Sequence, residues 1–174
     1  MGVYMDRARF ESVAEKYLDS MYRAAVNYCK NADDAADAVQ NAFFKLMTTD
    51  TIFEDDEHVH RWLIRVTINE CKGFWRSFWR RNVISLDALH DENENDPVFC
   101  QTDDHGTISP AEIWNAVTAL PAKYSIVLHL HYHEGYTVEE IAEILGLTPS
   151  NVLIRLHRGR TKLKDVFAKG DFYG

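Results

Sequence analysis

Residues 136–164 constrain the fold of this chain most, because they read YTVEEIAEILGLTPSNVLIRLHRGRTKLK. Thr137 and Glu140 form a T-x-x-E capping box, and an apolar face at helical spacing follows it. Gly146 stands where a left-handed residue ends a helix, and Pro149 follows at a position that tolerates a missing N–H. The pattern predicts two helices joined by a tight turn, the second of them basic, which is the sequence form of a helix-turn-helix.

The second helix of this motif has a buried stripe and an opposite polar face. Val152 and Leu156 begin the stripe, and helical spacing then leaves a basic face exposed. Proteins with this motif read DNA through the first turns of the second helix. An ordinary helical hairpin with a solvated basic face would show the same local pattern. The residues predicted to face outward are Ser150, Asn151, Arg155 and Arg158.

The charge of the chain is sorted along its length. The net charge is −8, yet residues 59–82 and residues 149–169 each carry six bases and one acid. Residues 83–112 carry eight acids and no lysine or arginine. Positive segments attract phosphate, while acidic surfaces suit a protein partner or keep non-specific DNA binding weak. Two separate basic segments therefore indicate a protein that touches DNA at two places.

Helical periodicity is present in both halves of the chain and fails between them. Residues 83–109 are acidic, rich in turn-forming residues and without clear periodicity. The segments before them that follow helical spacing are 6–29, 31–47 and 59–81. The sequence thus predicts an all-α protein of two small helical domains. They are an N-terminal domain at 1–82, joined by an acidic flexible linker at 83–109 to a C-terminal domain at 110–174 that contains the helix-turn-helix.

Composition favours a cytoplasmic protein. No segment approaches the ~20 apolar residues of a membrane span, and the N-terminus lacks the apolar core of a signal peptide. Cys29, Cys71 and Cys100 are widely spaced and odd in number. We therefore expect reduced, packed thiols rather than a disulfide framework or a zinc knuckle.

A group of histidines raises the alternative of a metal-binding protein. His129, His131 and His133 would share a face on a strand, but the surrounding periodicity favours a helix, on which only the first and last are neighbours. That pair lacks a third ligand at a recognisable spacing, so we expect no metal and no cofactor. The sequence contains no Gly-rich phosphate loop, nucleophile elbow or paired-acid motif, and the chain is not expected to be an enzyme.

Three blocks of the sequence resemble the extracytoplasmic-function (ECF) group of bacterial RNA polymerase sigma factors. NADDAADAVQNAFFKLM resembles the family's polymerase-clamp helix, and HRWLIRVTINECKGFWRSFWRR resembles its promoter-melting helix. LPAKYSIVLHLHYHEGYTVEEIAEILGLTPSNVLIRLHRGRTKLK resembles its promoter-reading domain. The blocks stand in the family's order and cover nearly the whole length outside the linker. The resemblance implies an alternative sigma factor that directs promoter-specific initiation of transcription.

The resemblance implies that the first block binds the clamp of the largest polymerase subunit. The matching residues, which share one polar face of the predicted helix, are Asp34, Asp37, Gln40 and Asn41. Asn41 stands where the family usually has Glu. A solvated helix face is the plain alternative.

The second block is implied to bind and open the −10 element. Its bases would hold phosphate, its aromatic side chains offer flat faces to unstacked bases, and Asn69 matches a position near the pocket for a flipped base. The residues implied are Arg61, Arg65, Asn69, Lys72, Trp75, Arg76, Trp79 and Arg80. Burial of Trp75 and Trp79 in the core is left open, whereas Trp62, Leu63, Val66 and Phe74 are expected to be buried. The preceding loop, 48–58, corresponds to the family's base-specificity loop and is unusually acidic.

The third block is implied to contact the flap of the second-largest polymerase subunit and to read the −35 element. Its implied DNA contacts are Ser150, Asn151 and Arg155, with Arg158 on phosphate. Leu153 and Ile154 depart from the family, which usually has polar or basic residues there. Two exposed aliphatic side chains favour contacts with thymine methyl groups, or a partner surface, over hydrogen bonding.

The partners expected from the resemblance are core RNA polymerase, promoter DNA and an anti-sigma factor that covers the polymerase-binding faces of the free chain. No membrane insertion is expected, and the acidic linker would lie in the RNA-exit path of the polymerase. The main alternative is a stand-alone helix-turn-helix regulator, which would leave the clamp-like helix and the first basic segment without a role. A His-based metal-binding protein is the weaker alternative.

Overall fold

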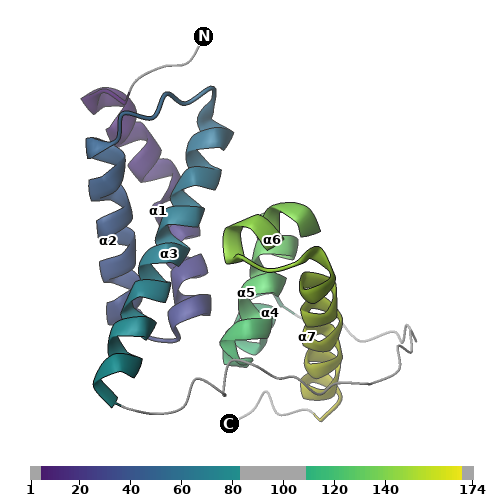
Figure 1. The fold of residues 1–174 in the computed structure, drawn as a ribbon. Helices are drawn as coiled ribbons and strands as arrows, with labels where there is room; N and C mark the ends of the chain where they lie inside the picture. Colours follow the sequence, from purple (N-terminus) through teal and green to yellow (C-terminus); the bar gives the residue numbers. More distant parts are fainter. Residues whose placement is uncertain (1–4, 83–108, 170–174) are drawn as a thin grey trace.

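The structure, a computed structural model, describes residues 5–82 and 109–169. Its elements in those ranges are seven α-helices and one π-helical turn. Figure 1 shows them as two groups, α1 to α3 and α4 to α7. The all-α prediction is confirmed. The predicted linker lies outside the described residues, except for Ser109, so the exact domain limits stay a prediction.

The first group contains three long helices whose ends follow from local chemistry. They are α1 (Arg7–Cys29), α2 (Ala32–Thr48) and α3 (Asp56–Asn82). The Asp6 side chain caps α1 by accepting from the Arg9 N–H at 2.8 Å, and the Asn31 side chain caps α2. The start of α3 lies three residues before the predicted Val59, because Asp55 accepts from the His58 N–H at 2.7 Å. The three helices pack around buried side chains that include Met21, Leu46 and Leu63.

The second group contains the predicted helix-turn-helix. Its helices are α4 (Pro110–Ala119), α5 (Ala122–Leu128), α6 (Val138–Leu145) and α7 (Pro149–Lys169). The predicted capping box of Thr137 with Glu140 is present, and Ser109 forms a second one with Glu112. Gly146 ends α6 in the left-handed conformation, with φ 69°. These local features of the motif are confirmed.

The helical segment that begins with α5 ends differently from the sequence expectation. A regular helix was predicted to run to about His133, but residues His129–His133 form a π-helical turn. Its wider register is fixed by hydrogen bonds from the Glu134 N–H to the His129 carbonyl at 3.1 Å and from the Tyr136 N–H to the Leu130 carbonyl at 3.0 Å.

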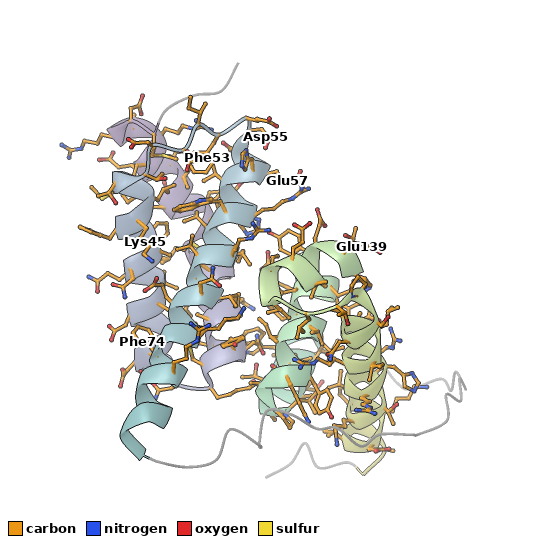
Figure 2. The ribbon with its side chains drawn as sticks, viewed as in Figure 1. Lys45, Phe53, Asp55, Glu57, Phe74 and Glu139 are labelled. Carbon is orange, nitrogen blue, oxygen red and sulfur yellow. The ribbon has the colours of Figure 1, made fainter. Side chains whose placement is uncertain are left out.

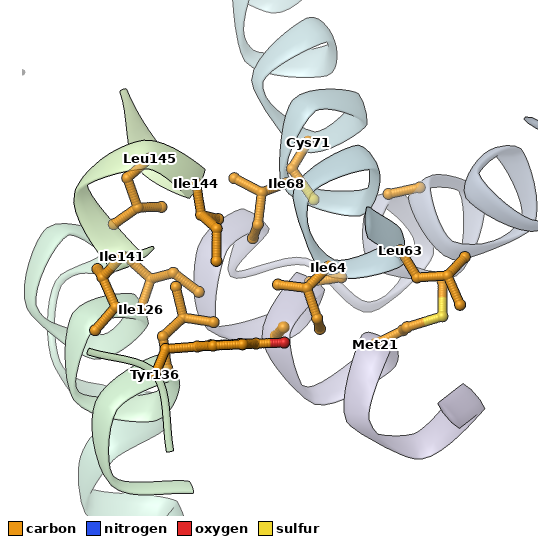
Figure 3. Close-up of a cluster of buried hydrophobic side chains, with 14 of the residues drawn as sticks. Met21, Leu63, Ile64, Ile68, Cys71, Ile126, Tyr136, Ile141, Ile144 and Leu145 are labelled. Atoms are coloured by element: carbon orange, nitrogen blue, oxygen red, sulfur yellow. The ribbon is translucent and has the colours of Figure 1, made fainter. Parts of the chain in front are cut away.

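The two groups share one hydrophobic core. The helix α1 lies against α5, and α3 lies against α6. In Figure 3, Ile64 and Ile68 of α3 face Tyr136 and Ile144 of the second group. These four side chains are at most 5% exposed. The sequence predicted two domains but did not predict that they pack against each other.

Candidate nucleic-acid interface

The basic face of α3 is directed at α6 in this structure. Arg61 lies 3.1 Å from the Glu140 carboxylate, and Arg65 lies 3.1 Å from the Glu143 carboxylate. Lys72 donates from Nζ to the Leu145 carbonyl at 2.8 Å, at the C-terminal end of α6, where carbonyls have no partner within the helix. Three of the residues implied in −10 binding are therefore engaged by the second half of the chain.

The remaining residues implied on α3 divide into two groups. Asn69 and Arg76 are exposed. The side chains of Trp75, Trp79 and Arg80 lie outside the described residues, so their orientation stays a prediction. Among the residues expected to be buried, Leu63 is fully buried, and the half-buried side chains that pack against the core are Trp62, Val66 and Phe74.

The loop before α3 is anchored by an aromatic side chain that the sequence interpretation missed. Phe53 is fully buried and meets the rings of His58 and Trp62 edge-on, at centroid distances of 5.4 and 5.7 Å. Figure 2 shows Phe53, Asp55 and Glu57 together at one end of α3. The carboxylates around it are exposed, so the loop presents an acidic surface fixed from beneath by Phe53. An apolar pair, Ile52 and Phe53, within an otherwise polar loop was the available signal.

The face of α2 predicted to bind polymerase is exposed and larger than expected. The exposed predicted residues are Asp34, Asp37, Gln40 and Asn41. Asn41 donates to the Glu70 carboxylate of α3 at 3.2 Å, beside the ion pair of Lys45 with Glu70. Phe44 and Met47, which were not predicted as site residues, are 67% and 63% exposed. Phe44 lies four residues after Gln40 and three after Asn41, and Met47 lies three residues after Phe44, hence on the same side of the helix.

The outer face of α7 differs from the prediction at two residues. Ser150 and Asn151 are exposed, and the Thr148 side chain caps the helix by accepting from the Asn151 N–H at 3.2 Å. Arg155 was predicted to face outward, but it is half-buried, and this burial lowers the pKa of its guanidinium. Arg158 is also half-buried.

A buried polar cluster joins the two halves. Ser20 of α1 donates to the Glu134 carboxylate at 2.8 Å and lies 2.8 Å from His60 Nε2 of α3. His60 Nε2 lies 3.4 Å from Glu134, and His129 Nε2 lies 3.2 Å from it without the geometry of a hydrogen bond. Burial lowers the pKa of both histidines. Burial alone would raise the pKa of Glu134, but its polar neighbours outweigh that effect and lower it.

The histidines considered as metal ligands form no such site within the described residues. The rings of His129 and His133 stack at a centroid distance of 4.9 Å, and His131 Nδ1 lies 3.0 Å from the Tyr136 carbonyl. Across residues 5–82 and 109–169, no group of three or more His, Cys, Asp or Glu side chains is placed to hold a metal ion. None of the helices described is long and apolar enough to cross a membrane.

Two family models match the chain, one in each half. The model described as Sigma-70 region 2 matches residues 13–81, which include α2, the acidic loop and most of α3. The model described as Sigma-70, region 4 matches residues 111–163, which include the helix-turn-helix. The two matches appear in one chain and in this order.

Relatives and solved structures agree with these matches over most of the chain. The ECF RNA polymerase sigma factor SigE of Mycolicibacterium smegmatis is 28% identical, and the match covers 92% of this chain and 62% of that protein. The RNA polymerase sigma factor SigV of Bacillus subtilis is 26% identical, with 89% of each chain covered. In fold, the chain is similar to the sigma factor RpoE in its complex with the anti-sigma factor NepR from Bartonella quintana. The TM-score is 0.62 at 19% identity, and the match covers 91% of this chain and 96% of that one.

The two-part helical fold and the two matched regions define a sigma factor of the sigma-70 type. A stand-alone helix-turn-helix regulator would not account for the region 2 match. Within this class, the chain belongs to the ECF group of RNA polymerase sigma factors, as the resemblance of its three sequence blocks implied.

Proposed function

We propose that this chain is the promoter-recognition subunit of an RNA polymerase holoenzyme and itself catalyses no reaction. The outer face of α2 binds the polymerase clamp, α3 and the loop before it act on the −10 element, and the helix-turn-helix contacts the polymerase flap and reads the −35 element. The observation that carries this proposal is the presence of both sigma regions in a single chain. A protein that works with polymerase on promoter DNA has its place in the cytoplasm.

The residue assignments follow from exposure and charge. On α2, the aliphatic and aromatic surface of Phe44 and Met47 extends the polar set Asp37, Gln40 and Asn41 into a larger docking surface, which we name the α2 face. Aromatic and Met side chains are enriched in protein–protein interfaces. On α3, the bases and Asn69 serve −10 DNA, together with Trp75 and Trp79.

Promoter binding requires the contacts between α3 and α6 to part. Arg61 and Arg65 cannot face carboxylates of α6 and phosphates of DNA at the same time. The described arrangement is therefore a closed form of the free chain, and the holoenzyme uses an open one. The solved structure to which the chain is similar in fold is a complex of RpoE with the anti-sigma factor NepR. We propose that an anti-sigma factor likewise holds this chain when it is not bound to polymerase.

The test is transcription by purified core polymerase of the native host, with and without the full-length chain, on a pool of genomic fragments. New start sites that share two upstream motifs at a fixed spacing are expected only with the chain present. An active core that yields no new starts with the chain would refute the proposal. Binding of the purified chain to those promoters without polymerase, at the same affinity, would favour a stand-alone regulator.

A further inference from the structure

One line of residues along the surface of α7 carries an exposed aliphatic side chain at its centre. Ser150, Ile154 and Arg158 are four residues apart, so they follow one another along the helix surface. The orientation is fixed from the opposite side, where Val152 and Leu156 are 0% and 1% exposed. Ile154 is left 50% exposed and its neighbour Leu153 is 54% exposed. The fold thus leaves two large apolar groups in water on the DNA-reading helix.

The long hydrogen-bonding side chain next to Ile154 does not share this line. Arg155 is half-buried, whereas Ile154 is exposed. Ser150 and Asn151 are short and lie at the first turn of the helix. Beyond the first turn, the group best placed to meet a base edge is therefore an apolar one.

The charge around Ile154 suits DNA better than an apolar protein surface. Three bases, Arg160, Lys162 and Lys164, are exposed on the same helix after it. Phosphate contacts of this kind fix the register of a recognition helix in the major groove. Ile154 would then be held against the edges of the bases.

We propose that Ile154, with Leu153 beside it, reads the methyl group of a thymine in the −35 element. The inference rests on the proposed function. In the major groove the thymine methyl is the apolar group that base edges offer, whereas cytosine presents an amino donor and guanine presents two acceptors. An isoleucine against those polar edges would bury them without partners, which costs free energy. The promoter therefore carries thymine opposite Ile154.

The experiment uses holoenzyme reconstituted from native core polymerase and the full-length chain. A promoter mapped by its start site is remade with each −35 thymine replaced in turn by uracil. Uracil keeps the hydrogen-bonding edge of thymine and removes only the methyl group. The rate of abortive RNA synthesis at subsaturating holoenzyme is measured for the wild type, for Ile154→Ala and for Ile113→Ala. Ile113 is a matched control, since it is 45% exposed but lies on α4, outside the helix-turn-helix.

For the wild type, uracil at one −35 position is expected to lower the rate about threefold to fivefold, the change that corresponds to burial of one methyl group. Ile154→Ala is expected to lower the rate on the thymine promoter by a similar factor and to show no further loss with uracil. Ile113→Ala should keep the uracil penalty of the wild type. Circular dichroism of both variants confirms that the fold is retained.

Equal uracil penalties in the wild type and Ile154→Ala would overturn the inference and assign the exposed pair to a protein partner. Normal initiation by the wild type with no uracil-sensitive position would overturn it as well. Failure of the wild-type holoenzyme to produce promoter-specific starts would be seen before any uracil template is used. That outcome would refute the proposed function itself, so the two failures are distinguishable.

Discussion

Gly159 marks the closest approach of α7 to α5. A Cβ at this position would lie 2.8 Å from Leu128 Cδ1 and 3.1 Å from Leu128 Cγ, and Leu128 is only 2% exposed. The leucine has no room to withdraw, because its neighbours in the core are close-packed. Gly73 of α3 is exposed, and a Cβ there would meet nothing within 4 Å. The two glycines therefore serve different purposes.

Gly159→Ala is expected to lower the free energy of unfolding by about 1–3 kcal/mol, because overpacking outweighs the gain in helix propensity. Gly73→Ala, the matched control, is expected to raise it by up to about 1 kcal/mol, since alanine favours the helix at no steric cost. Urea denaturation followed by circular dichroism measures both. Stabilisation by both substitutions would contradict the close packing of α5 on α7.

Phe44 has the largest exposed fraction among the large apolar side chains described, at 67%. If the α2 face docks on polymerase, Phe44→Ala is expected to weaken binding to core polymerase roughly fivefold to thirtyfold, the usual loss for an aromatic side chain at the centre of an interface. Leu18→Ala on α1 removes a similar exposed side chain, 52% exposed, outside this face and should have little effect. Titration of labelled chain with core polymerase separates the two outcomes. If Phe44→Ala bound core polymerase with the same affinity as Leu18→Ala, Phe44 would not be part of the interface.

At the scale of single elements, α6 depends on its first turn. It has only eight residues, and the Thr137 hydroxyl accepts from the Glu140 N–H while the Glu140 carboxylate accepts from the Thr137 N–H at 2.9 Å. Thr137→Ala is expected to lower the free energy of unfolding by about 0.5–2 kcal/mol, the range for loss of an N-cap. Thr161→Ala is the control, since that hydroxyl donates to the His157 carbonyl of its own helix and caps no helix end. Similar losses in the two variants would argue against a special role for the cap.

Helix ends could be predicted from the sequence because capping depends on residues that are close along the chain. Asn31, Ser109 and Thr137 each cap a helix where their spacing to the following residues indicated it. The exposure of Phe44 was also readable, since it is out of phase with the buried Ala38, Ala42 and Leu46. That signal was available and was not used.

The contacts between the two halves were beyond sequence reasoning. Arg65 and Glu143 are 78 residues apart, and nothing in the periodicity of either helix indicates the other as partner. Arg155 and Arg158 were predicted to face outward but are half-buried, which the helical periodicity of α7 alone did not indicate. The π-helical turn places His129 among Trp114, His133 and Glu134, and such tertiary surroundings leave no local sequence pattern.

At the scale of the whole molecule, two acidic residues of α6 would oppose the DNA binding proposed for α3. Exposed ion pairs contribute about 0.2–1 kcal/mol each, so Glu140→Gln with Glu143→Gln is expected to raise the affinity of the free chain for −10 DNA by a fewfold. Fluorescence anisotropy with a labelled −10 oligonucleotide measures this. The matched control, Glu139→Gln with Asp165→Asn, removes the same charge at exposed positions outside these contacts. If both pairs of substitutions raised the affinity for −10 DNA equally, the contacts between α3 and α6 would not be the cause of the increase.

The buried cluster of Ser20, His60, His129 and Glu134 predicts how stability changes with pH. Burial holds the pKa of both histidines below the ordinary value of 6.5, so the unfolded chain binds protons first as the pH falls. The pKa of Glu134 lies below its ordinary 4.5, so its contribution is lost only at more acidic pH. The free energy of unfolding is therefore expected to fall as the pH drops below about 6.5.

The groups that face this cluster come from both halves of the chain. The ring of Tyr17 stacks on His60 at 4.5 Å, and the charges of Glu57, Lys16 and Arg23 act on the two histidines. Urea midpoints measured from about pH 8 to about pH 5 test the prediction. Replacing His60 and His129 together by Gln should remove most of the decline. A wild-type midpoint that stays constant over this range would show that the two histidines do not couple stability to pH.

Under the proposed function, the pairing of α3 with α6 makes α6 compete with DNA for the arginines of α3. Because both helices belong to one chain, dilution of the protein does not weaken this competition. Glu140 and Glu143 are tethered to the arginines that they occupy, so their local concentration stays the same however little protein is present. The apparent affinity of the free chain for −10 DNA is its intrinsic affinity multiplied by the fraction of open molecules. Any partner that binds only the open form removes this reduction and thereby increases DNA affinity without touching DNA. Overproduction of the chain alone raises the numbers of closed and open molecules in the same proportion. The reduction in apparent affinity for −10 DNA is therefore unchanged.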